Sequence, residues 1–200
     1  GSERLALATR QGAVVIWDLP GARTVQTLSW RGREAASTPE ALEGTQVGAT
    51  SPDGRRFGFV VANRLTVWNL QTLEEAAALT RSAAAPRILS FARDNESVAV
   101  ANDDGTIEVC RLASRERVGL WRAHRDFISG LAFMPDGKLL LSSSADSTLK
   151  LWDVASCQEL PRFSRSENRY LSLAVTPDGL RVAAGSSKRD IRIWNAATGQ

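Results

Sequence analysis

Similar short motifs recur along the chain at a fixed interval, and this periodicity constrains the fold more than any other feature. Each motif is an apolar run that ends in Trp, or a replacement for Trp, followed by a polar residue. The five runs occupy residues 14–18, 65–69, 107–111, 149–153 and 191–195. Their Trp-equivalent positions are separated by 51, 42, 42 and 42 residues. Internal periods of roughly 20 to 50 residues are typical of solenoids and propellers.

A turn motif repeats in phase with these runs. Pro-Asp-Gly occurs at residues 52–54, 135–137 and 177–179, and residues 93–96 occupy the corresponding place in the third unit without Pro or Gly. In such a turn Pro presets φ and Gly accepts a positive φ. Each unit therefore reads as short strands separated by tight turns.

The unit that ends at Trp152 shows the expected strand pattern most clearly. Its apolar runs predict strands at residues 128–133, 139–143, 148–154 and 159–163, the last with Pro161 at an edge position. Four antiparallel strands in about 42 residues form one propeller blade. We therefore predict an all-β fold in which residues 1–200 form a single segment of about five blades. The units of this segment end near Trp17, Trp68, Cys110, Trp152 and Trp194.

The Trp-Asp endings, the Pro-Asp-Gly turns and the 42-residue spacing make the chain resemble the WD-repeat family, and its bacterial-type members in particular. The resemblance covers essentially the whole chain. It implies a β-propeller, and because closed rings of this family usually have seven blades, we expect an incomplete ring with strands missing at both ends. Open inner strands and uncovered apolar blade faces would then favour self-association.

The resemblance also implies a hydrogen-bonded structural tetrad in the unit that ends at Trp152. Its members would be His124, Ser142 or Ser144, Asp146 and Trp152. A buried indole N–H and a buried imidazole each need a partner, and a chain from Trp through Ser to His and Asp provides them. Other units depart from this pattern, with Cys110 in place of Trp in the third and Lys188 in place of Asp in the fifth.

The rare residues argue against an enzyme. One His and two Cys are too few for a site of several histidines or a four-cysteine cage. His124-Arg125-Asp126 matches the start of a protein-kinase catalytic loop, but the metal-binding Asn of that loop would fall at Leu131. No glycine-rich phosphate loop accompanies it. We predict no catalytic residue, no metal and no cofactor.

Charge and cysteine content restrict the kind of partner and the cellular compartment that we expect. The net charge of +3 comes from basic residues scattered along the chain, a pattern that disfavours nucleic acid as a partner. Cys110 and Cys157 form no Cys-x-x-Cys pair and favour a reducing compartment. No run approaches the roughly 18 apolar residues of a membrane helix. We predict a cytoplasmic protein that does not bind membranes.

Candidate partner-binding residues lie in the longer first interval, in the loops before the inner strands and at the hairpin tips. The resemblance implies that these connections emerge on the face where partners dock, and Trp and Arg are favoured hot-spot residues. The candidates are Trp30, Arg31, Arg87, Arg125, Phe127, Arg169, Tyr170 and Lys188. The simpler alternative is that Trp30 covers a blade edge and the others form a solvated rim.

Together these features predict a non-catalytic protein–protein interaction scaffold that presents a rigid propeller face to peptide or protein partners. The alternative function is a regulatory or targeting module of a larger multidomain signalling enzyme, such as a bacterial Ser/Thr kinase.

Overall fold

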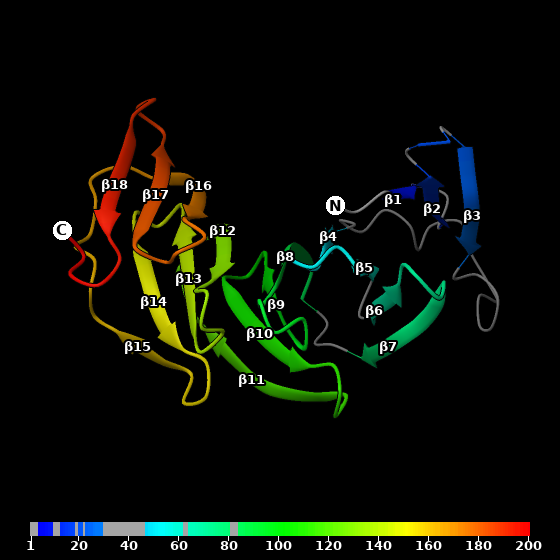
Figure 1. Ribbon diagram of the computed structural model, residues 1–200. Helices are drawn as coiled ribbons and strands as arrows, with labels where there is room; N and C mark the ends of the chain where they lie inside the picture. Colours follow the sequence, from blue (N-terminus) through cyan, green and yellow to red (C-terminus); the bar gives the residue numbers. More distant parts are fainter. Residues whose placement is uncertain are drawn as a thin grey trace.

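A computed structural model describes residues 4–9, 13–18, 20–21, 23–29, 47–61, 64–80 and 84–200 of the chain. The regular elements within these ranges are β-strands, which form five antiparallel sheets (Figure 1). Three sheets have four strands, and the first and last have three. The predicted all-β fold of blade-like antiparallel sheets is confirmed. Among the described residues, no helix is long and apolar enough to cross a membrane.

Strand order follows the chain in every sheet, so each sheet is a simple meander. The first sheet comprises β1 (Arg4–Thr9), β2 (Ala13–Asp18) and β3 (Arg23–Ser29). The second comprises β4 (Val47–Thr50), β5 (Arg56–Val61), β6 (Arg64–Asn69) and β7 (Glu74–Thr80). The third comprises β8 (Pro86–Phe91), β9 (Ser97–Asn102), β10 (Thr106–Arg111) and β11 (Glu116–Arg122). The fourth comprises β12 (Ile128–Phe133), β13 (Leu139–Ser144), β14 (Leu149–Asp153) and β15 (Gln158–Leu160). The fifth comprises β16 (Tyr170–Val175), β17 (Arg181–Ser186) and β18 (Ile191–Asn195).

The fourth strand of the fourth sheet is shorter than the sequence predicts. It ends at Leu160, so Pro161 follows the strand and does not occupy an edge position within it. Proline has no N–H to donate to the ladder and its ring fixes φ, and both properties end strand pairing here. The prediction of a strand that reaches residue 163 is wrong.

The turns between first and second strands repeat one hydrogen bond. The N–H groups of Gly54, Gly137 and Gly179 donate to the carbonyls three residues earlier, at 2.9, 2.9 and 2.8 Å. All three glycines have φ near +70°, which residues with a Cβ rarely adopt. In the third sheet Asn95 takes this place with φ of 59° and makes the same bond to Ala92, because Asn tolerates the left-handed region better than most residues.

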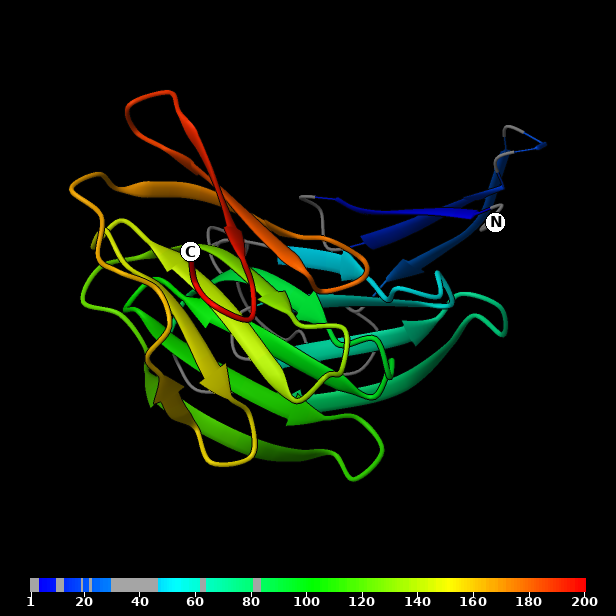
Figure 2. The same ribbon diagram turned by 60° about the vertical axis from the view of Figure 1, so that its left-hand side comes forward.

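The sheets follow one another in a curved row, and the first and last lie at its two separate ends (Figures 1 and 2). From the second sheet to the fifth, the first strands of neighbouring sheets contact each other: β4 with β8, β8 with β12, and β12 with β16. Apolar side chains fill the space between neighbours. Between the fourth and fifth sheets, for example, Leu141 and Leu151 pack with Tyr170 and Val182.

One face of the fifth sheet is uncovered. Ile191 and Ile193 in β18 are 74% and 62% exposed, whereas Leu149 and Leu151, one repeat earlier in β14, are each 2% exposed. The difference arises because the fifth sheet covers the β14 pair and no described sheet covers the β18 pair. The row of sheets therefore ends on an apolar surface.

The two ends of the sheets carry different connections between strands. At one end, which we call the turn face, residues from four first-strand turns line a single cavity of about 140 Å³. They include Pro52, Arg93, Pro135 and Pro177. The opposite end, which we call the hairpin face, carries the segments before the first strands and the hairpins between second and third strands. These segments are 84–85, 123–127 and 164–169, and the hairpins are 103–105, 145–148 and 187–190.

Candidate functional site

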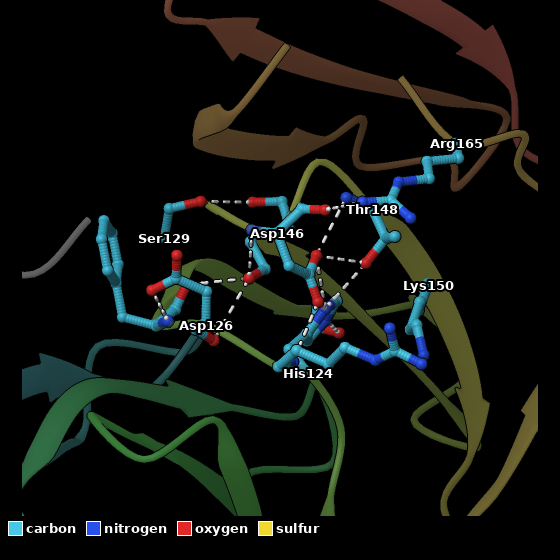
Figure 3. Close-up of polar contacts among 12 residues, drawn as sticks. His124, Asp126, Ser129, Asp146, Thr148, Lys150 and Arg165 are labelled. Carbon is cyan, nitrogen blue, oxygen red and sulfur yellow. Dashed lines mark hydrogen bonds and ion pairs between the residues drawn. The ribbon is translucent and has the colours of Figure 1, made fainter. Parts of the chain in front are cut away.

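The hairpin face of the fourth sheet is organised by a buried polar chain. Ser142 Oγ in β13 accepts a hydrogen bond from Trp152 Nε1 in β14 at 2.9 Å and lies 2.7 Å from His124 Nε2. His124 Nδ1 lies 3.1 Å from Asp146 Oδ2 in the hairpin (Figure 3). One network thus joins the segment before β12, the strands β13 and β14 and the hairpin between them, through His124, Ser142, Trp152 and Asp146.

The order of the hydrogen bonds assigns the protons of this network. The indole N–H of Trp152 can only donate, so Ser142 accepts there and has its own hydroxyl proton free for His124 Nε2. His124 then carries its proton on Nδ1 and donates it to the Asp146 carboxylate. Every polar side-chain atom of these four residues has a partner, which is the condition under which such a network rigidifies its surroundings.

Asp146 is the end point of the network and accepts further hydrogen bonds. The backbone N–H groups of Arg125 and Thr148 donate to its carboxylate at 3.0 Å each, and Thr148 Oγ1 donates at 2.5 Å. Burial alone would raise the pKa of Asp146, but the hydrogen bonds from His124, Thr148 and Arg125 outweigh it and hold this pKa well below its usual range. Asp146 is therefore a fixed anion that clamps the hairpin to the segment before β12.

Ser144, the second sequence candidate for the serine position, makes different contacts. Its hydroxyl lies 2.9 Å from the Phe127 carbonyl and 3.2 Å from the Asp126 carbonyl, and its oxygen accepts from the Asp146 N–H at 3.0 Å. Ser144 therefore ties residues 126–127 to the hairpin and lies outside the chain that joins Trp152 to His124.

The second sheet lacks the serine link. Ser142 pairs with Lys150 in the fourth sheet, and the corresponding pair in the second sheet is Phe59 with Thr66. Phe59 is 3% exposed, so an apolar ring occupies the place of the serine, and the buried indole nitrogen of Trp68 has no hydrogen-bond partner. In the third sheet Cys110 is 1% exposed at the Trp position, as a small core residue.

A repeated backbone bond holds the loops of the hairpin face in place. The N–H groups of Asp103, Ala145 and Ser187 donate to the carbonyls of Ala85, Phe127 and Arg169, at 2.9, 3.2 and 2.9 Å. The donors and the acceptors are each spaced by 42 residues, so one contact recurs in three sheets. Side chains on these loops are therefore presented from fixed backbone positions.

One basic candidate, Arg87, and one aromatic candidate, Phe127, contact each other on this face. The guanidinium carbon of Arg87 in β8 lies 4.6 Å from the centre of the Phe127 ring, which belongs to the segment before β12. Arg87 is exposed and Phe127 is half-buried. This is a cation–π contact across the boundary between the third and fourth sheets.

The remaining basic candidates lie along the same face. Arg125 is exposed beside Asp146, and Arg169 and Lys188 are exposed on the linked loop and hairpin of the fifth sheet. Trp30 and Arg31 fall outside the described residues.

Tyr170 does not belong to this surface. It is 1% exposed and packs with its ring edge toward Trp194, at 5.9 Å between ring centres. The prediction that it contacts a partner is wrong, because Tyr170 begins β16 and points into the core between the fourth and fifth sheets.

The comparison with family patterns agrees with this geometry. The pattern for the WD domain, G-beta repeat, matches residues 115–153 and 160–195. The first matched segment contains all four members of the polar network, and the second contains β16, β17 and β18. No curated protein matches the chain.

His124, the histidine of the first matched segment, is fully engaged within the protein. The His124 side chain has no exposed surface, and both of its ring nitrogens are engaged. Within the described ranges, no three His, Cys, Asp or Glu side chains are grouped to hold a metal ion. The network holds the hairpin against the segment before β12 and so fixes the shape of this part of the hairpin face.

Sequence reasoning missed three residues at this site: Thr148, Lys150 and Arg165. Thr148 had a detectable signal, because Asp-x-Thr occurs at both 104–106 and 146–148, and in both the Thr N–H and hydroxyl donate to the Asp. Lys150 and Arg165 had none, since their importance depends on which side chains converge in space.

Proposed function

We propose that this chain is a non-catalytic protein–protein interaction scaffold of the cytoplasm, and that its hairpin face is the docking surface. WD repeats generally mediate protein–protein interaction, and two segments of the chain match the WD-repeat pattern. The polar network of the first repeat supports the proposal, because it fixes the loops without using any exposed group.

The Arg87–Phe127 contact is the observation that carries the proposal. A guanidinium laid on an aromatic ring is held in place before a partner arrives, so less side-chain entropy is lost on binding. Arg is enriched at binding hot spots, and aromatic residues are enriched at interfaces. Since the two residues come from different sheets, the contact also marks a point where the relative position of the sheets is fixed.

The charge of the hairpin face indicates the kind of protein that would bind. Arg87, Arg125, Arg165, Arg169 and Lys188 are all exposed there. Complementary charge mainly accelerates encounter and selects partners, so an acidic peptide or protein surface is the fitting counterpart.

The test is capture of partners from an extract, followed by titration of the purified partner. The double variant R87Q/F127L removes the cation and the ring but retains polar length and apolar volume. We expect it to weaken binding by at least about tenfold, because loss of a hot spot costs about 2 kcal/mol or more.

The matched control is R55Q/R181Q, which removes two exposed arginines of the turn face. It should bind as the unmodified chain does, and both variants should keep the melting temperature. Equal binding by R87Q/F127L and the unmodified chain would refute the hairpin face as the docking surface.

A further inference from the structure

A basic pocket opens on the hairpin face beside the hairpin of the fourth sheet. It has a volume of about 210 Å³ and is lined by Arg125, Asp146, Thr148, Lys150 and Arg165. Figure 3 shows Arg165, Thr148 and Lys150 on one side of Asp146, with His124 below. We call it the Arg125–Arg165 pocket. A water molecule occupies roughly 30 Å³ of liquid, so this space admits a small polar group with several waters.

Two of its three cations have no acidic partner among the described residues. The ion pairs of the described part of the chain include neither Arg125 nor Arg165. Lys150 Nζ donates to Glu159 Oε2 at 2.8 Å and lies 5.3 Å from the centre of the Trp152 ring. The lysine is therefore anchored on a carboxylate, whereas neither guanidinium group is held by one.

The one acidic group that lines the pocket is already occupied. Asp146 accepts from His124, from both donors of Thr148 and from the Arg125 backbone. Its negative charge reduces the net positive charge of the pocket, but its oxygens accept hydrogen bonds from groups of the protein itself. A ligand that brings its own oxyanion would meet the guanidinium groups without displacing an existing ion pair.

The polar network also positions the two arginines. The Arg125 N–H is fixed on Asp146 at 3.0 Å, and Arg165 Nη2 lies 3.5 Å from the Asp146 carbonyl. Next to Arg165, the Ser166 N–H donates to the Ser147 carbonyl at 3.0 Å. Both arginines are thus attached to the same hairpin, one from the segment before β12 and one from the segment before β16.

We propose that the Arg125–Arg165 pocket binds an oxyanion side chain, a carboxylate or a phosphate, carried by an acidic peptide segment of the partner. This inference rests on the proposed scaffold function and names the feature that the partner must carry. Guanidinium groups match the planar, two-oxygen geometry of such anions, and their weak hydration lowers the cost of the contact.

The test uses three labelled peptides with identical neutral flanks and a central run of glutamate, phosphoserine or glutamine, measured by fluorescence anisotropy at low and high salt. We expect the glutamate or the phosphoserine peptide to bind and the glutamine peptide not to bind. The tighter of the first two identifies the source of the oxyanion. Failure of both acidic peptides to bind at low salt would overturn the inference.

The variant R125Q/R165Q keeps the backbone donor of Arg125 and removes both guanidinium groups. It should weaken acidic-peptide binding by about tenfold or more, because hydrogen bonds to charged groups are among the strong ones. The control R55Q/R181Q, with the same charge change on the turn face, should change affinity less than about twofold, as expected for surface charges at a distance. Equal losses in both variants would show a general charge effect and overturn the pocket.

The two proposals fail separately. Acidic-peptide binding that survives in R125Q/R165Q overturns the pocket and leaves the scaffold function standing. Partner binding that survives in R87Q/F127L refutes the docking surface, whatever the peptides do.

Discussion

The indole N–H of Trp152 donates to Ser142 Oγ at 2.9 Å, and this bond begins the only complete Trp–Ser–His–Asp chain among the described sheets. At the same point of the second sheet, the indole nitrogen of Trp68 is buried without a partner. Two tryptophans in equivalent strands thus differ in one hydrogen bond. The difference makes the energetic value of the network measurable within one molecule.

Replacement of each tryptophan by phenylalanine should separate packing from hydrogen bonding. Both changes remove the indole, but W152F also leaves Ser142 without its donor, whereas W68F removes an unpartnered N–H. We expect W152F to lower the free energy of unfolding by about 1–2 kcal/mol more than W68F does. Urea unfolding of both variants under one condition gives the difference, and equal losses would show that the network adds nothing to stability.

Phe59 explains why the second sheet lacks the link, because it stands at the position of Ser142 and is 3% exposed. We expect F59S and F59A each to lower the free energy of unfolding by about 3–5 kcal/mol, because each removes a buried ring. F59S should be the more stable of the two by about 1 kcal/mol, since its hydroxyl can accept from the Trp68 indole N–H. Urea unfolding of both variants gives the difference. Equal stability of F59S and F59A would contradict the assignment of this position.

The pH dependence of stability should carry the signature of Asp146. Its pKa is held low in the folded chain by the hydrogen bonds that outweigh burial, and it returns to about 4 on unfolding. Protons therefore bind preferentially to the unfolded chain in acid. The stabilisation is fully present above the unfolded pKa and is lost as the pH falls toward the folded pKa.

We expect D146N to be less stable near neutral pH and to lose less further stability between about pH 5 and pH 2 than the unmodified chain. Asp103 is exposed in the equivalent turn of the third sheet, so D103N controls for the loss of one negative charge. Denaturant midpoints across this range provide the measurement. Parallel curves for D146N and the unmodified chain would exclude Asp146 as the source of the acid sensitivity.

The repeat predicts the strands well because one 42-residue pattern fixes both their order and their turns. The same periodicity corrects the interpretation of Tyr170 as a surface residue. As a residue between a loop and a strand it resembles a surface aromatic, yet one repeat earlier stands Ile128, which is fully buried in β12. The burial of Tyr170 is therefore predicted by its position in the repeat. Its residue type does not predict it, because tyrosine is found both in cores and at surfaces.

The side-chain contacts on the hairpin face could not be predicted from the sequence. Arg87 and Phe127 are close to one repeat apart in the chain, but their contact depends on how neighbouring sheets are rotated against each other. The same holds for Arg125 and Arg165, which are brought to one pocket by the fourth-sheet hairpin. A period gives the order of strands within a sheet and leaves the angle between sheets to side-chain packing.

The uncovered face of the fifth sheet leads to the last prediction, which concerns self-association. Ile191 and Ile193 are exposed where their equivalents Leu149 and Leu151 are buried by the next sheet. Burial of such side chains is worth about 2 kcal/mol each, so a second copy that covers this face would gain on the same terms as a neighbouring sheet.

We expect the 200-residue chain to associate as its concentration rises, and I191S/I193S to shift this association to markedly higher concentration in sedimentation velocity. The control V118S/L120S also removes two exposed apolar side chains, but from β11, which is the outer strand of the third sheet. It should associate as the unmodified chain does, because β11 does not lie on the open face of the row. If the chain remains monomeric at high concentration, exposure of Ile191 and Ile193 does not drive self-association. If only the control V118S/L120S loses association, the copies contact each other through the outer strands.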